Sequence, residues 1–76
     1  MNGKRRADLR NALYILGKAA VIVDSVCDRE QDSIDNTPEN LQNTDRYDMM
    51  KRAVENLNEA ADKIDEAKEY IETAMR

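Results

Sequence analysis

Histidine, tryptophan and phenylalanine are absent from this 76-residue sequence, and cysteine and proline occur once each. Without histidine, one chain cannot build a Ser-His-Asp triad, a Cys-His pair or a zinc site that uses imidazole. With a single cysteine there is no internal disulfide, as is typical of a reducing cytoplasm. With two glycines and one proline, little interrupts a helix. The composition therefore predicts one all-α domain over residues 1–76, cytoplasmic and non-enzymatic, without a cofactor or a small-molecule substrate.

The net charge is −4 and is unevenly distributed. Four basic residues near the start (Lys4, Arg5, Arg6 and Arg10) accompany only Asp8, whereas the stretch from Asp24 to Asp48 has eight acids and two bases. Because phosphate binding requires Lys and Arg, an acidic body makes nucleic acid an unlikely partner. The basic start leaves a weaker alternative, a small DNA-binding regulator that uses the N-terminus of each protomer.

The apolar run from Ala12 to Val23 faintly resembles a signal peptide behind its basic residues. Lys18 interrupts the run, and twelve residues are too few to span a bilayer. We expect an amphipathic helix here, with no signal peptide and no membrane contact.

A seven-residue repeat predicts a helix over about residues 45–75. One line of the repeat holds Met50, Leu57, Ile64 and Ile71, and the other holds Ala53, Ala60, Ala67 and Ala74. Apolar residues in alternating steps of three and four are typical of a coiled-coil seam. Val54, Ala61 and Met75 widen this seam slightly. The alanine line would allow a neighbouring helix to approach closely.

A second amphipathic pattern predicts a helix over about residues 5–32. Its apolar lines are Leu9-Leu16-Val23, Ala12-Ala19-Val26, Leu13-Ala20-Cys27 and, on the flank, Ile15-Ile22. These lines cover about 160° of the helix, which is wider than a two-helix seam requires. Tyr14 and Val21 widen the surface further. We therefore predict an antiparallel helical hairpin that pairs into a homodimeric four-helix bundle, with Tyr14, Ile15, Val21 and Ile22 at the interface.

Residues 33–44 are predicted to form an ordered corner. Thr37 is expected to act as an N-cap with Pro38 at the first helical position, so that Thr37→Ala would cost about 1 kcal/mol. Leu41 is expected to point into the bundle, and Thr44 or Asn43 to cap the second helix.

Few side chains suggest a chemical site. Cys27 lies on an apolar line beside Asp24 and Asp28 and is predicted to be a small core residue. The ligand-type residues Asp28, Glu30, Asp32 and Glu39 fall at positions one, three, five and twelve of an EF-hand window. Position six is Ser33 where the calcium loop needs glycine, so we expect no metal site.

Five acids, Glu55, Glu59, Asp62, Glu66 and Glu69, form an acidic stripe opposite the alanine line. Like charges four residues apart destabilise a helix slightly, so the stripe does not stabilise the fold. It is either a solvated face that keeps the protein soluble or a mimic of nucleic-acid phosphate that occupies a basic groove on another protein.

The corner residues Glu30, Gln31, Asp35, Asn36, Pro38, Glu39, Leu41 and Gln42 match an E-Q-x-x-x-D-N-x-P-E-x-L-Q pattern. In this respect the chain resembles a group of small acidic helical-hairpin proteins, mostly uncharacterised, of bacteriophages and mobile elements in gut-type bacteria. The resemblance covers about the last two thirds of the chain. It implies a phage or mobile-element origin and no catalytic activity.

Beside the weaker DNA-binding alternative, two functions remain open at this point. The first is a structural or protein-interaction module that self-associates and presents a surface to a host or phage protein. The alternative is an acidic inhibitor of a host nucleic-acid-binding or defence protein.

Overall fold

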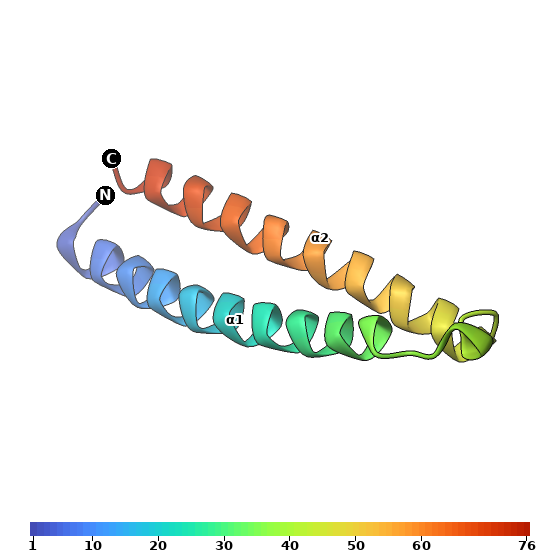
Figure 1. Cartoon of the computed structure of the whole chain (residues 1–76). Helices are drawn as coiled ribbons and strands as arrows, with labels where there is room; N and C mark the ends of the chain where they lie inside the picture. Colours follow the sequence, from blue (N-terminus) through green and yellow to red (C-terminus); the bar gives the residue numbers. More distant parts are fainter.

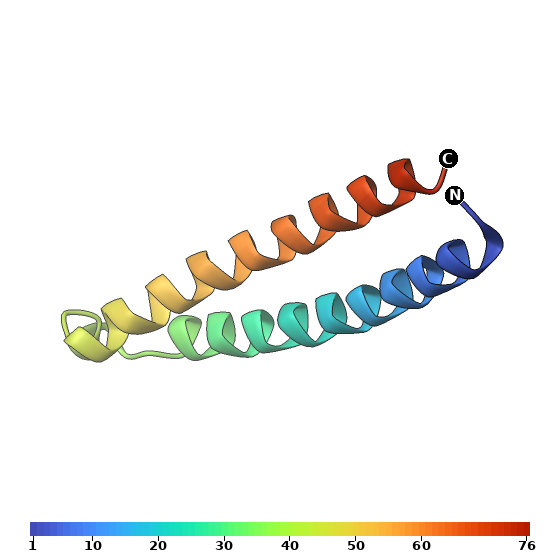
Figure 2. The same cartoon turned by 180° about the vertical axis from the view of Figure 1, so that it is seen from behind.

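The computed structural model describes the whole chain, residues 1–76, as an antiparallel hairpin of two long helices. Helix α1 (Gly3–Asp35) is followed by the short 3₁₀ helix η1 (Glu39–Leu41) and by helix α2 (Asp45–Ala74). The two termini lie together at one end and the corner at the other (Figures 1 and 2). The predicted all-α hairpin is confirmed.

Helix α1 is longer at both ends than the periodicity predicted. At its start, the Asn2 side-chain oxygen accepts a hydrogen bond from the Arg5 backbone N–H at 2.8 Å, which satisfies one of the free donors of the first turn. At its end, the Asn36 N–H donates to the Asp32 carbonyl at 2.9 Å. Polar caps rather than apolar residues determine these ends, so the apolar pattern underestimated the length.

The predicted role of Thr37 is wrong. Its hydroxyl donates to the Ser33 carbonyl at 2.7 Å, and thus completes the end of α1 instead of starting the next helix. The residue before η1 is Pro38, which makes no side-chain cap. The physical reason is proximity, because the last turn of α1 leaves carbonyls free directly behind Thr37.

Leu41 is also placed differently from the prediction. Its side chain is 47% exposed and lines an open hollow with Pro38, Tyr47 and Met50. The short helix η1 carries Leu41 around the end of the hairpin, where no further layer covers it (Figure 1).

Thr44 caps α2, as one of the two predicted candidates. Its hydroxyl oxygen accepts the Tyr47 N–H at 3.2 Å and donates to the Leu41 carbonyl at 2.9 Å. Asp45 and Asp48 lie in the first turn, where the helix dipole favours negative charge.

We expect Thr44→Ala to lower the free energy of unfolding by about 1 kcal/mol, because the N-terminal cap of α2 is lost. Thr37→Ala is the matched comparison and should cost less than about 0.5 kcal/mol, since its bond lies at an exposed helix end. Urea unfolding followed by circular dichroism measures both values. A larger loss for Thr37→Ala would contradict this assignment of the caps.

The helices pack through two lines of side chains each. Leu9-Leu16-Val23 and Leu13-Ala20-Cys27 of α1 face Met50-Leu57-Ile64-Ile71 and Val54-Ala61-Met75 of α2, and all of these residues are buried or half-buried. The alanine line of α2, which was predicted to be one of the two seam lines, is therefore not at the centre of the contact, and this part of the prediction is wrong. Ala53 and Ala60 are half-buried at its edge, and Ala67 and Ala74 are exposed. A straight helix drifts about 20° per heptad, so a repeat alone does not say which neighbouring line lies innermost.

The hairpin encloses very little. Only Cys27 and Val54 are buried, at 8% and 9% exposure. The accessible surface is 5883 Å², whereas a compact protein of 8.7 kDa exposes about 4,700 Å². The radius of gyration of 17.4 Å likewise exceeds the roughly 11 Å of a compact 76-residue domain. Neither helix is long and apolar enough to cross a bilayer.

Candidate interaction surfaces

The four predicted interface residues all lie outside the hairpin interior. Tyr14, Ile15, Val21 and Ile22 are 56–69% exposed, so α2 covers none of them. Nothing in the chain folds over this part of α1 (Figures 1 and 2). An exposed group of large apolar side chains is typical of an interaction site.

These residues form two separate lines on α1. Ile15 and Ile22 lie one above the other, whereas Tyr14 and Val21 are turned about 100° from them. Lys18 lies between the two lines, and its ammonium group is 4.9 Å from the centroid of the Tyr14 ring. A flat partner can therefore cover one line fully, but not both.

Alanine lines on both helices lie on the same side of the hairpin. In each helix, the alanine line lies about 80° around the helix axis from the mean direction of the two inner lines, and the sense of this rotation is the same in both helices when each is viewed from its N-terminus. Both helices are right-handed and they run antiparallel, so equal turns bring the two lines to one side. Glu30 of α1 lines a shallow hollow with Met49 and Ala53 of α2. This contact agrees with the two alanine lines lying on the same side of the hairpin.

We call this side the alanine face. Its members on α1 are Ala12, Ala19 and Val26, with Ile15 and Ile22 at the outer edge. Its members on α2 are Ala53, Ala60, Ala67 and Ala74, with Met49, Asn56, Lys63 and Tyr70 at the outer edge. The opposite side of the hairpin carries exposed polar residues such as Asp24, Asn58 and Asp65. The face was missed in the sequence. Alanine spacing in both helices was visible there, but the side shared by the two lines was not.

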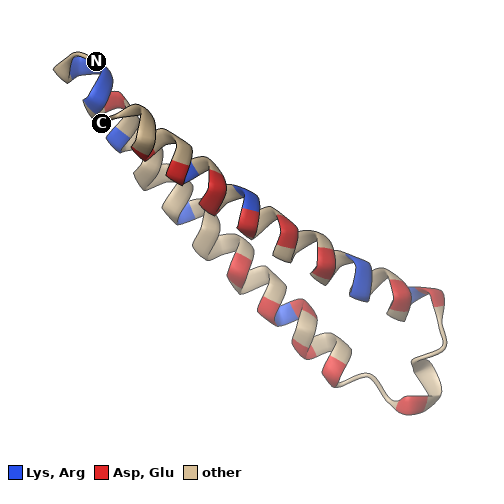
Figure 3. Cartoon of the chain, turned by 90° about the horizontal axis from the view of Figure 1, so that it is seen from above, with Lys and Arg blue, Asp and Glu red and all other residues tan.

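The acidic stripe is fully available to solvent. Each of its five residues is exposed, and Figure 3 shows acidic positions repeating along α2. Lys63 is the nearest cation, with its ammonium 3.8 Å from Glu59 and 3.4 Å from Glu66. Exposed pairs of this kind contribute little, so the stripe retains a strong negative field.

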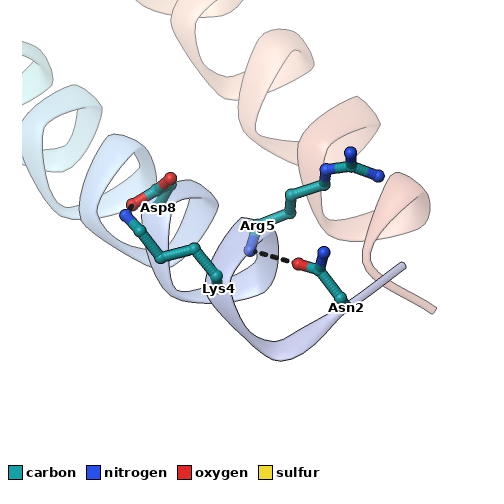
Figure 4. Close-up of polar contacts among 4 residues, drawn as sticks. All are labelled: Asn2, Lys4, Arg5 and Asp8. Atoms are coloured by element: carbon teal, nitrogen blue, oxygen red, sulfur yellow. Dashed lines mark hydrogen bonds and ion pairs between the residues drawn. The ribbon is translucent and has the colours of Figure 1, made fainter.

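The basic N-terminus is partly engaged within the chain. The Lys4 ammonium pairs with Asp8 at 2.8 Å, as Figure 4 shows beside the Asn2 cap. The Arg6 Nε donates to the Met75 carbonyl at 3.2 Å and ties the start of α1 to the end of α2. These contacts disfavour a free basic arm for DNA.

Cys27 is a small core residue, as predicted. Its thiol is buried and donates to the Asn58 side-chain oxygen at 3.3 Å, with the Val54 carbonyl at 3.9 Å. The contact places Cys27 beside the turn of α2 that holds Val54 and Asn58.

The residues of the EF-hand window lie mainly on a helix. Asp28, Glu30 and Asp32 are within α1, which continues to Asp35, so they do not surround a common point as loop ligands do. No group of three acidic or cysteine side chains is arranged to hold a metal ion.

We expect millimolar calcium, or a chelator, to leave the melting temperature unchanged. The window has helical geometry and has Ser33 in place of the required glycine. Thermal unfolding followed by circular dichroism measures this directly. A rise of several degrees that is specific to calcium would contradict the prediction.

Comparisons with protein-family models, with curated proteins and with solved structures return no match.

Proposed function

We propose that this chain is a non-enzymatic protein-interaction module that self-associates as a homodimer and forms a four-helix bundle. Its resemblance to phage and mobile-element proteins supports a phage or mobile-element origin. The chain would then act in the cytoplasm of a bacterial host. A host or phage protein can then bind the outer surface of the bundle.

The observation that carries this proposal is the surface left uncovered by one hairpin. The chain exposes about 1,100 Å² more than a compact protein of its mass. Ile15 and Ile22 contribute to that excess, because more than half of each is exposed to water. Complete burial of an isoleucine side chain contributes about 1.5–3 kcal/mol, and more than half of that is still to be gained at each position. A core of this size supplies only about 3–5 kcal/mol, so a second copy would stabilise the fold substantially. Two-fold pairing is the commonest way to supply it.

Analytical ultracentrifugation of the wild-type chain at micromolar concentration tests the proposal. The expected sedimenting mass is twice the 8.7 kDa of the chain. Circular dichroism on the same sample reports whether the chain is helical. A well-folded monomer would overturn the homodimer and would leave the exposed flank for a different protein.

The alternative is an inhibitor that mimics nucleic-acid phosphate, and it rests on the acidic stripe. The five carboxylates are exposed, and only Glu59 and Glu66 approach a cation. Such an inhibitor would bind a basic nucleic-acid-binding protein and no DNA. Binding should weaken steeply with salt and in Asp62→Lys, while that variant keeps its oligomeric state. Salt-independent capture of a partner, unaffected by Asp62→Lys, would overturn the mimicry.

A further inference from the structure

We infer that the second copy packs on the alanine face with its long axis reversed, so that the two corners lie at opposite ends of the dimer. This inference rests on the proposed self-association and specifies its geometry. The two-fold axis would cross the middle of the hairpin, close to Ala19 of α1 and Lys63 of α2.

The residues of α1 on this face are complementary to themselves when reversed. Read along the helix they are Ala12, Ile15, Ala19, Ile22 and Val26. Reversal about Ala19 places Ala12 opposite Val26 of the second copy, and brings Ile15 to within one residue, about 1.5 Å, of the level of its Ile22. Ala19 then meets its own copy at the axis, where a small side chain allows close approach.

Helix α2 has the same property about a point between residues 63 and 64. Reversal there places Ala60 opposite Ala67 of the second copy, and Ala53 opposite its Ala74. The alanines on both sides allow the two copies of α2 to approach closely. Lys63 and its copy would lie beside the axis at the outer edge, each with its ammonium 3.8 Å from Glu59 and 3.4 Å from Glu66 of its own chain.

The two centres lie at the same height in the hairpin, although each was found from one helix alone. Cys27 contacts Val54 and Asn58, and Arg6 contacts Met75. Interpolating between these contacts places Ala19 level with Lys63 to within about one residue, given that both helices rise equally per residue. One two-fold axis therefore satisfies both helices, as a symmetric dimer requires.

The charges of the two ends also favour the reversed arrangement. The half with the termini, residues 1–20 and 60–76, has eight basic and six acidic side chains. The half with the corner, residues 21–59, has four basic and ten acidic side chains. Reversal places each net positive end on a net negative end, whereas a parallel pair would place like on like (Figure 3).

The face is large enough for a stable dimer. The hairpin measures 60 × 15 × 13 Å, so one long side can bury roughly 800 Å² per partner, the size of a standard interface. Tyr14 and Val21 would remain outside it, because they are turned about 100° from Ile15 and Ile22.

The test is disulfide trapping of the Ala19→Cys variant with a mild oxidant, analysed on a non-reducing gel. Alanine-lined helices about 8 Å apart bring facing Cα atoms within roughly 4–6 Å, which a disulfide can bridge. We expect a band at twice the monomer mass, with mass spectrometry showing a bond between the two introduced thiols. Wild type, whose only thiol is buried, and Val21→Cys, exposed on the other side of α1, should give none.

The outcomes separate this geometry from the proposed function. If wild type sediments as a dimer and Ala19→Cys does not cross-link, or Val21→Cys cross-links instead, the reversed packing is wrong while self-association stands. In a parallel dimer, Ala19 would face α2 of the second copy, and the introduced thiols would not meet. If wild type sediments as a folded monomer, both the function and this geometry fail.

Discussion

Ile22→Asp is expected to sediment as a monomer or to unfold at concentrations where the wild-type chain is a dimer. The Ile22 side chain is 63% exposed in the single hairpin and would be buried by the second copy. A two-fold dimer would bury two such aspartates. Each would lose the free energy of burying an isoleucine side chain, up to about 1.5–3 kcal/mol, and would add the cost of removing a carboxylate from water. We therefore expect a loss of at least about 3 kcal/mol, or about a hundredfold in Kd. Analytical ultracentrifugation across a concentration series measures it.

The matched control is Asp62→Lys, at an exposed position of the acidic stripe on the outer side of α2. It also changes a charge, but it should leave both the assembly and the helical content intact. A dimer that tolerates Ile22→Asp without loss of affinity would contradict an interface on this side of α1.

Val54→Asp is expected to abolish the folded hairpin. Val54 is 9% exposed and is one of only two buried residues, against the Cys27 side of α1. An ionised carboxylate there would lose its water, at a cost of several kcal/mol. Because a core of this size supplies only about 3–5 kcal/mol, the helical signal in circular dichroism should fall to that of an unfolded chain at 25 °C.

Val21→Asp makes the same substitution at a position that is 69% exposed, and it should retain the helical signal. The comparison isolates burial as the cause, since the side chain introduced is identical. Folded Val54→Asp with wild-type stability would show that the contact between α1 and α2 is not what stabilises the hairpin.

The sequence by itself determined the local structure. Apolar periodicity predicted both helices and the inner line Met50-Leu57-Ile64-Ile71. The polar residues before the second helix limited its cap to Thr44 or Asn43, of which Thr44 makes the contact. Cys27 was predictable as a core residue because it continues an apolar line beside acidic neighbours. These features depend on the spacing of residues within one helix, which the sequence contains directly.

Only the tertiary structure decided how the helices face one another. The Thr37 hydroxyl bonds backwards to Ser33, and Leu41 lies half in solvent, because the path of the chain around the corner determines their neighbours. Val54 lies innermost on α2 and Ala67 is exposed, since the rotation of a packed helix about its axis depends on its partner. The alanine face arises in the same way: two lines of small residues on separate helices meet on one side only when right-handed helices pack antiparallel in this register.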